Sequence, residues 1–241
     1  FTALKQADRH PLMKQADWVL TLDIDEFACI KAGGGTVADL LAALPEADAV
    51  TLTWRLFGNA GIVRYEDAPV TAQFTRCAPE VIHWPWRAVM FKTLYRNDGT
   101  YRKCGVHRPR DVRDAARLEG FRWFDCEGRE LGGAFKTKRL FSDYGRPNVR
   151  LAQLNHYPLG AMESYVLKAD RGRVNRQAEL GMDYWVERNY CSDMDTSITR
   201  YDAARAGLQA ELMADPKLAR LHARAVEWRH ARFAELMARR P

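Results

Sequence analysis

The sequence contains no long apolar run. No uninterrupted stretch reaches the roughly 18 residues that a membrane-spanning helix requires, so a protein built on transmembrane helices is excluded. Cysteine is scarce, since the five cysteines are widely scattered and form no CxxC pair. This spacing argues against a disulfide framework or a zinc cluster and indicates reduced thiols in a cytosol. The glycine run KAGGG (31–35) lacks the GxxxxGK[ST] pattern, which excludes a P-loop there.

What is present is an ordinary globular composition with a positive charge balance. Of the 241 residues, 47% are hydrophobic and 28% are charged, as in typical globular domains. Lysine and arginine (37) exceed aspartate and glutamate (31) by 6. This surplus favours anionic partners such as phosphates, acidic glycans or the anionic face of a membrane. No recognition motif or long basic stripe accompanies it, so nucleic acid is not an expected partner.

Local signals predict a mixture of helices and strands. Residues 1–17 have a helical character, and Thr36 is a suitable N-cap for a helix that runs through Leu44. Residues 49–58, AVTLTWRLFG, predict a strand. Residues 62–143 form a patchwork of short β-like pieces separated by long loops, which indicates an α+β region.

The last third of the chain predicts helices. One begins near Ala161, and residues 198–240 predict a pair of amphipathic helices divided where Asp215 caps and Pro216 takes the first helical position. One apolar stripe runs along the last helix, formed by Leu218, Leu221, Ala225 and Trp228. We expect this stripe to pack on its own domain, with contact to a membrane surface or a partner as the alternative.

Residues 18–27, WVLTLDIDEF, end an apolar run on two aspartates. The run predicts a strand buried on both faces of a parallel sheet, and such strands carry their chemistry at the carboxyl end. Alternation puts Asp23 and Asp25 on the same side, where two carboxylates repel unless a cation lies between them. Hard oxygen ligands suit Mg²⁺ or Mn²⁺, which keep positions open for phosphate oxygens. A pair of turn or capping carboxylates is the alternative.

Several further segments follow DIDEF (23–27) in a fixed order. They are WRLFGNAG (54–61), FKTLYR (91–96), GVHRP (105–109), LNHYPLGAMESYVLKADRGRVNR (154–176) and DTSI (195–198). Together these segments resemble the bacterial family 2-like glycosyltransferases, the DxDEF group related to the family 92 glycosyltransferases. The resemblance covers nearly the whole chain from Asp17 to Arg200.

The resemblance implies an α/β chain with the A-type glycosyltransferase (GT-A, Rossmann-like) fold and C-terminal helices. In that group an NE-containing strand and a D/N-x-S-x-D-G-T nucleotide-binding segment precede the DxD strand, and neither occurs here. We therefore expect the fold to lack its N-terminal strands, which would pair beside residues 18–23. Residues 1–197 are predicted to be the catalytic region without its N-terminal nucleotide-binding part, and residues 198–241 a helical extension.

In the resembling family the DxD pair binds a divalent ion that clamps the donor diphosphate. The resemblance thus implies that Asp23 and Asp25 hold Mn²⁺ or Mg²⁺, with His156 as a further ligand. Glu26 beside the pair is the candidate base, with a sugar-hydroxyl acceptor or a structural support as alternatives. Asp125 is a weaker candidate, because FDCEG predicts a hairpin turn.

Other residues are candidates for substrate contacts. The predicted substrate-binding residues are Lys92, His107, Lys168 and Arg171. Lys168 and Arg171 share one predicted helix face, and Arg173 and Asn175 follow them. Two cations on one face favour a bound diphosphate, with an exposed basic face as the alternative. Tryptophans that could stack on sugar rings are Trp54, Trp84, Trp86 and Trp123, for which core packing is the alternative.

Taken together, the sequence predicts a metal-dependent glycosyltransferase of the hexosyltransferase type. It would move a sugar from a nucleotide-diphosphate donor to a glycan or lipid-linked acceptor in surface polysaccharide synthesis. The expected location is the cytoplasm, and peripheral association with the inner face of the membrane is an additional expectation. Two alternatives stay open: a non-catalytic carbohydrate-binding or degenerate transferase domain, and a DxD phosphotransferase of the haloacid dehalogenase type. The second is disfavoured because Phe27 stands where those enzymes need Thr or Val.

Overall fold

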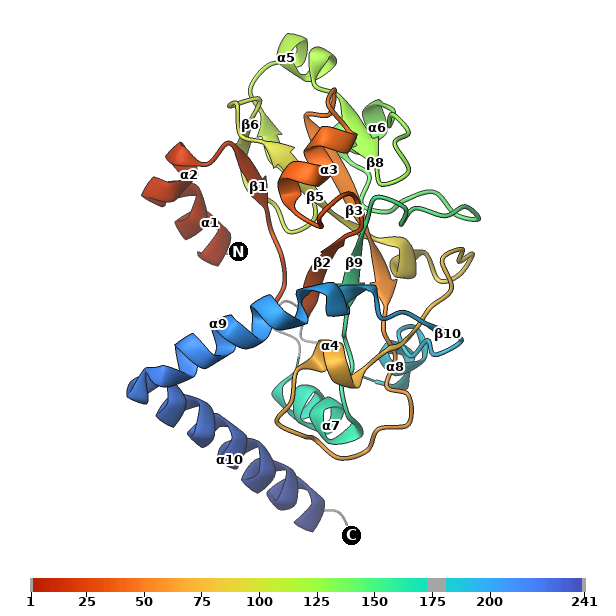
Figure 1. Ribbon diagram of the computed structural model, residues 1–241. Helices are drawn as coiled ribbons and strands as arrows, with labels where there is room; N and C mark the ends of the chain where they lie inside the picture. Colours follow the sequence, from red (N-terminus) through yellow and green to blue (C-terminus); the bar gives the residue numbers. More distant parts are fainter. Residues whose placement is uncertain (1, 173–180, 240–241) are drawn as a thin grey trace. The chain divides into compact units, whose positions relative to one another are not determined.

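The computed structural model describes residues 2–172 and 181–239 (Figure 1). Arg173 and Asn175, predicted near the donor phosphates, lie outside these described residues. The chain divides into two compact units, one formed by Phe1–Leu56 with Ala78–His156 and the other by Phe57–Cys77 with Tyr157–Pro241. The architecture is mixed α/β, as the sequence predicts. The division of function between residues 1–197 and 198–241 stays a prediction.

The first unit is built on a curled central sheet. Within the described residues six strands belong to it, in the order β1 (Trp18–Leu20), β5 (Phe91–Arg96), β3 (Ala49–Leu56), β9 (Ala152–His156) and β2 (Glu26–Ile30), with β8 (Trp123–Asp125) also paired to β3. Strand β3 runs parallel to β8 and β9. The pairs β1–β5, β3–β5 and β2–β9 are antiparallel. The sheet is therefore mixed rather than parallel.

Strand β3 is central because both of its faces are apolar enough to be buried. Its sequence, AVTLTWRL, is rich in β-branched and aromatic residues, which favour strands, and every residue except Trp54 is buried. One core includes Leu40, Val50, Leu52 and Leu94. The core on the other face includes Ala49, Phe91, Tyr95 and Trp123. The strand predicted at residues 49–58 is confirmed.

Helix α3 (Val37–Ala43) contributes Leu40 to the first core, and its start is encoded locally. The Asp39 N–H donates to the Thr36 hydroxyl at 3.1 Å, and the Thr36 N–H donates to the Asp39 carboxylate at 2.9 Å. This reciprocal pair is a capping box, which satisfies backbone donors at the helix start. The predicted cap at Thr36 is confirmed.

Residues 18–27 do not form one central strand of a parallel sheet, so that prediction is wrong. Strand β1 ends at Leu20, the chain turns at residues 24–25, and Glu26 opens β2, which pairs with β9. Among the described residues, β1 pairs only with β5 and lies at an edge of the sheet (Figure 1). The run is apolar because both faces of β1 pack on a core. Trp18 and Leu20 pack on one core, and Val19 packs on the other. Burial of both faces does not require a neighbouring strand on both edges.

Short elements complete the first unit. They are α1 (Thr2–Arg9), α2 (Pro11–Gln15), the 3-10 helix η1 (Trp86–Val89), the paired strands β6 (Tyr101–Lys103) and β7 (Arg110–Val112), α5 (Ala115–Gly120) and α6 (Gly133–Thr137). Helices α1 and α2 confirm the helical character predicted near the start of the sequence. The irregular stretch predicted between residues 62 and 143 is also present.

The second unit is mainly helical. Its elements are α4 (Val70–Gln73), β4 (Arg76–Cys77) paired with β10 (Asp193–Met194), α7 (Met162–Arg171), α8 (Met182–Val186), η2 (Ser197–Tyr201), α9 (Asp202–Ala214) and α10 (Pro216–Ala238). Helix α7 begins directly after Ala161, as predicted. The Asp215 side chain accepts the Lys217 and Leu218 N–H groups, which confirms the predicted start of α10. Across the described part of the chain, none of the helices has the length and apolarity that crossing a membrane requires.

The apolar stripe of α10 is exposed, so the prediction that it packs on its own domain is wrong. Leu218, Leu221 and Trp228 are all exposed to solvent. Side chains off the stripe hold α10 instead: Arg229 donates to the Ser164 hydroxyl at 2.7 Å, and His222 Nε2 lies 2.9 Å from the Asp67 carboxylate. These polar contacts attach α10 to its own unit, and the apolar stripe stays exposed to solvent.

Candidate functional site

The two aspartates predicted to bind a metal lie in a tight turn that leads into β2. The Glu26 N–H donates to the Asp23 carbonyl at 3.1 Å, and the Asp23 N–H donates to Glu26 Oε2 at 2.9 Å. Ile24, at the tip of this turn, is 96% exposed. The Asp23 and Asp25 side chains are 56% and 30% exposed. The turn therefore presents two solvent-accessible carboxylates.

Behind the turn, a buried lysine meets the two nearest carboxylates. Lys92 Nζ lies 2.9 Å from Asp23 Oδ2 and 3.3 Å from Glu26 Oε2. The other oxygen of Glu26 accepts the Trp54 Nε1–H at 2.7 Å. The side chains of Lys92 and Glu26 are fully buried. Buried charges are tolerated only when they are paired and hydrogen-bonded. This pair therefore supports the turn in one position.

Strand register explains why these side chains meet. Glu26 of β2 is opposite His156 of β9, and Lys92 of β5 is opposite Leu52 of β3. Trp54 lies two residues after Leu52, and β9 pairs with this end of β3. Alternate residues of a strand share a face, so side chains from all four strands project from one face of the sheet.

The environment of Glu26 gives it a positioning role. Burial raises the pKa of its carboxyl above the ordinary value of 4.5, and the nearby Lys92 ammonium opposes that shift. Both carboxylate oxygens already accept hydrogen bonds, from the Asp23 N–H and the Trp54 indole. Glu26 thereby holds the turn from behind. Its role as a catalytic base stays a prediction.

Asp25 and His156 form the outer part of the site. Asp25 Oδ1 lies 3.7 Å from His156 Nε2. His156 is buried at the end of β9, and its ring lies 4.3 Å from the Trp54 ring between centroids. Packing against the indole therefore orients the imidazole so that Nε2 is near the Asp25 carboxylate.

His107 lies beside this cluster. Its ring is 5.7 Å from that of Trp54, and its Nδ1 is 2.9 Å from the Phe91 carbonyl oxygen. Burial lowers the pKa of His107 below the ordinary value of 6.5; the Phe91 hydrogen bond opposes this shift, and the positive charge of Lys92 adds to it. A neutral imidazole at pH 7 follows, and it donates Nδ1–H to Phe91 because a carbonyl only accepts.

Asp25 and His156 are the two side chains of the site that lie close enough together to share a divalent ion. Metal–oxygen and metal–imidazole nitrogen distances are both about 2.1 Å, so the 3.7 Å between Asp25 Oδ1 and His156 Nε2 is less than twice a ligand distance. Asp23 is a weaker ligand, because its Oδ2 is bonded to Lys92. Within residues 2–172 and 181–239, no group of three or more His, Cys, Asp and Glu side chains is arranged to hold a metal. An ion here would therefore need oxygen ligands from phosphate or water, which is a common mode for Mg²⁺.

Lys168 and Arg171, predicted to contact phosphate, belong to α7 of the second unit. Lys168 Nζ donates to the Pro158 carbonyl at 2.6 Å and lies 5.4 Å from the centre of the Tyr184 ring. Arg171 is exposed. The contacts of Lys168 described here are with its own unit, and the phosphate role of both residues stays a prediction.

The four tryptophans considered for sugar stacking have different environments. Trp54 is part of the site, whereas Trp123 is fully buried in the core and has no face available to a sugar. Trp84 and Trp86 are exposed at and beside η1. Asp125 lies in the hairpin turn that FDCEG predicts, where its carboxylate accepts backbone N–H groups.

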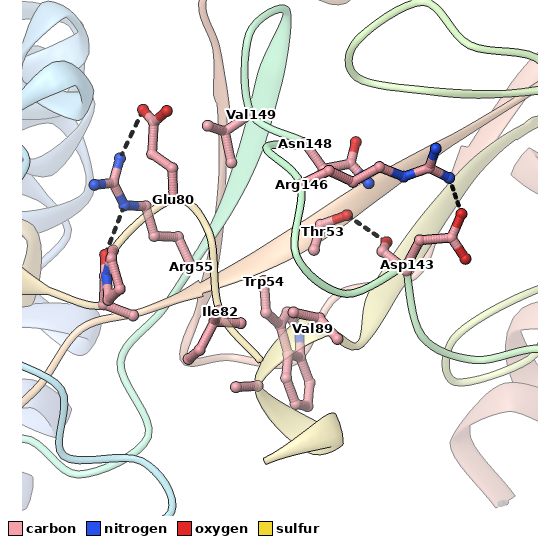
Figure 2. Close-up of a pocket in the computed structure, with 14 residues that line it drawn as sticks. Thr53, Trp54, Arg55, Glu80, Ile82, Val89, Asp143, Arg146, Asn148 and Val149 are labelled. Carbon is pink, nitrogen blue, oxygen red and sulfur yellow. Dashed lines mark hydrogen bonds and ion pairs between the residues drawn. The ribbon is translucent and has the colours of Figure 1, made fainter. Parts of the chain in front are cut away.

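A second group of polar side chains lies on the opposite face of β3, and sequence reasoning missed it (Figure 2). Arg55 Nε donates to the Ala78 carbonyl at 3.2 Å, and Nη1 lies 3.6 Å from Glu80 Oε1. The hydroxyls of Thr53 and Ser142 are 2.6 Å apart. The cavity among these groups has a volume of about 20 Å³, which suffices for about one water molecule. It is too small for a sugar or a nucleotide.

Sequence reasoning also missed how Lys92 is held. It predicted a substrate contact for Lys92 but neither the buried pair with Glu26 nor the hydrogen bond from Trp54. A signal was present, since Lys92 stands in FKTLYR (91–96), whose neighbouring residues suit a buried strand. A lone cation in such a strand requires a buried anion.

Comparison with protein-family models and with curated proteins found no match to this sequence. Function is therefore inferred from the chemistry of the site in the first unit, together with the ordered segments of the sequence.

Proposed function

We propose that this chain is the catalytic portion of a metal-dependent glycosyltransferase with an A-type α/β fold, acting on a nucleotide-diphosphate sugar. The observation that supports this most is the carboxylate turn. Of its two accessible aspartates, Asp23 is held by the buried pair of Lys92 and Glu26, and Asp25 lies 3.7 Å from His156. Transfer from such a donor leaves a diphosphate whose growing negative charge must be neutralised.

Asp25 and His156 would hold Mn²⁺ or Mg²⁺, and the second oxygen of Asp23 would be available to the ion or to a sugar hydroxyl. When bound, the ion would neutralise charge on the leaving diphosphate. Glu26 and Lys92 keep the turn in one conformation, so that the outer carboxylates need little reorganisation when the donor arrives. The partly buried ring of Trp54 and the neutral ring of His107 pack against each other on the inner side of the site.

In the proposed transfer, the bond between the anomeric carbon and the diphosphate oxygen breaks. The acceptor hydroxyl oxygen forms the new bond to that carbon and passes its proton to a base, for which Glu26 is the candidate, while the nucleoside diphosphate leaves with the electron pair of the broken bond. The acceptor would be a glycan or a lipid-linked sugar in surface polysaccharide synthesis. A role for Lys168 and Arg171 at the diphosphate is part of the same proposal.

Binding of Mn²⁺ tests the proposal, because it depends on residues of the first unit. Free Mn²⁺ is followed by electron paramagnetic resonance as the protein is titrated. Replacing one ligand, by Asp25→Asn, should weaken Mn²⁺ binding by about tenfold or more. Asp17→Asn is the matched control, since it removes an exposed aspartate of the same unit outside the turn. Equal Mn²⁺ affinity in the two variants and the unmodified chain would contradict the metal assignment.

Donor binding is measured next, by calorimetry with a panel of nucleotide sugars in the presence and absence of Mn²⁺. Binding of any one donor only with Mn²⁺, and its loss in Asp25→Asn, would support the transferase. Binding of free sugars with no need of Mn²⁺ would favour the carbohydrate-binding alternative.

A further inference from the structure

Helix α10 carries an exposed apolar stripe along one side. Leu218 is 39% exposed, Leu221 is 48% exposed and Trp228 is 60% exposed. Together with Ala225 they are spaced at three and four residues, which places them on one face of the helix. A tryptophan with most of its surface in water is uncommon, because burial of large aromatic side chains is strongly favourable.

A row of cations runs directly beside this stripe. Lys217, Arg220 and Arg224 are all exposed, and each precedes a residue of the stripe by one position; the corresponding position before Trp228 holds the exposed Glu227. Among the residues that the structure describes, none of these three side chains has a carboxylate partner. Like charges at three- and four-residue spacing destabilise a helix slightly. The row therefore gives a positive electrostatic potential to the side of α10 where the stripe is exposed.

The other basic residues of the same region are paired, which sets the row apart. Arg232 bonds to Asp170 at 2.9 Å and to Glu235 at 2.7 Å, and Arg239 also bonds to Glu235. Arg229 donates to the Ser164 hydroxyl at 2.7 Å. Helix α10 thus uses its later arginines for contacts within its unit, whereas the row beside the stripe is left for another partner.

We propose that the stripe and the row together bind the surface of an anionic lipid bilayer. A helix whose apolar side carries Leu and Trp and whose polar side carries Lys and Arg lies in the interface of such a membrane. Tryptophan prefers this depth because its ring is apolar and its N–H is polar. Anionic headgroups supply the negative charge that the row lacks.

A second copy of this chain is the rival occupant, and the charges disfavour it. The same face of a second copy would bring the same apolar stripe but also the same three cations. The apolar contact would be satisfied, but one Glu227 in each copy could neutralise only one of the three cations beside it. An anionic bilayer satisfies both features at once.

Co-sedimentation with lipid vesicles tests the proposal on the whole chain. The vesicles contain phosphatidylcholine alone or phosphatidylcholine mixed with phosphatidylglycerol, at low and at high salt. We expect binding to the anionic vesicles, little binding to the neutral ones, and weaker binding at high salt because salt screens the headgroup charge. No preference for the anionic vesicles would overturn the proposal.

Two variants separate the two features. Replacing the row (Lys217→Gln, Arg220→Gln, Arg224→Gln) should weaken binding to anionic vesicles on the order of 100-fold, from the usual effect of each cation near such a surface. Trp228→Glu should weaken binding to anionic vesicles by about tenfold or more, because it removes apolar surface that the bilayer would bury. All four positions are exposed, so the fold should persist, and circular dichroism checks this.

A matched triple variant controls for net charge. Lys5→Gln, Arg9→Gln and Lys14→Gln remove three exposed cations from α1 and α2, and this variant should keep its vesicle binding. Equal loss in the two triple variants would show nonspecific charge attraction and overturn the proposal. Light scattering without vesicles tests the rival. The stripe would be assigned to a second copy if the unmodified chain is a dimer that does not bind vesicles and Trp228→Glu makes it monomeric.

Discussion

Two groups of paired charges, one in each unit of this protein, differ in their access to water. In the first unit, Lys92 and Glu26 are 3.3 Å apart and have no exposed side-chain surface. In the second unit, Arg232 of α10 bonds to Asp170 and Glu235, and all three side chains are partly exposed. In both groups a cation lies at hydrogen-bonding distance from a carboxylate. Water does not reach the side chains of Lys92 and Glu26, whereas it does reach those of Arg232, Asp170 and Glu235.

The two kinds of ion pair differ in how much stability the protein loses when one partner is removed. Removing one member of a buried pair leaves an uncompensated charge in the protein, which typically destabilises it by about 3–5 kcal/mol. Removing one member of an exposed pair changes the free energy of unfolding by about 0–1 kcal/mol, because water solvates the remaining charge. The buried pair therefore fixes one conformation of the carboxylate turn, whereas the exposed pairs only assist the docking of α10.

The largest effect is expected at Lys92. Lys92→Met should lower the free energy of unfolding by about 3–5 kcal/mol, because Glu26 stays buried without its cation. Urea denaturation measures the change. Lys103→Met is the matched control: it removes an exposed pair with Asp111, at 2.7 Å, and should lower the free energy of unfolding much less than Lys92→Met does. Equal effects of the two substitutions would remove the distinction between buried and exposed pairs.

A double variant sharpens this first prediction. In Lys92→Met with Glu26→Gln, neither buried charge is left alone, so the double variant should be more stable than Lys92→Met by itself. If the two substitutions simply add, the pair is not coupled and the turn is held by other contacts.

An intermediate effect, visible as a pH dependence, is expected from Glu26 alone. Its pKa in the folded protein is raised above 4.5 by burial. For such a group, the proton-linked stability is full below the unfolded pKa and is lost as pH rises through the folded pKa. The unmodified protein should therefore lose stability relative to Glu26→Gln as the pH increases from 4.5. Urea midpoints of both proteins across this range give the difference, and a difference that is constant or changes in the other direction would refute the raised pKa.

The smallest effect is expected at Arg232. Arg232→Met removes its bonds to Asp170 and Glu235 but leaves those carboxylates accessible to water. The free energy of unfolding should fall by much less than in Lys92→Met, and by less still at high salt. A loss as large as that of Lys92→Met would show that the docking of α10 depends on this residue.

Several features of the fold could be predicted because their causes are local. The Thr36 capping box, the start of α10 at Asp215 and Pro216, and the strand at β3 depend on residues within a few positions of one another. The Asp23–Asp25 pair was also visible as a candidate site. Its support was not, because Lys92 and Glu26 are 66 positions apart in sequence, and only the pairing of β5, β3, β9 and β2 brings them together.

The amino-acid sequence by itself determined where α3, α10 and β3 start and which residues carry charge near the turn. Only the tertiary structure decided that residues 18–27 divide into an edge strand, a turn and β2, and that the stripe on α10 stays exposed. The physical reason is the range of the interactions. Caps and turns close through hydrogen bonds between near neighbours. Burial of an apolar face or of a charge depends on which distant segment covers it, and an apolar pattern is the same whether that segment is another strand, another helix or a membrane.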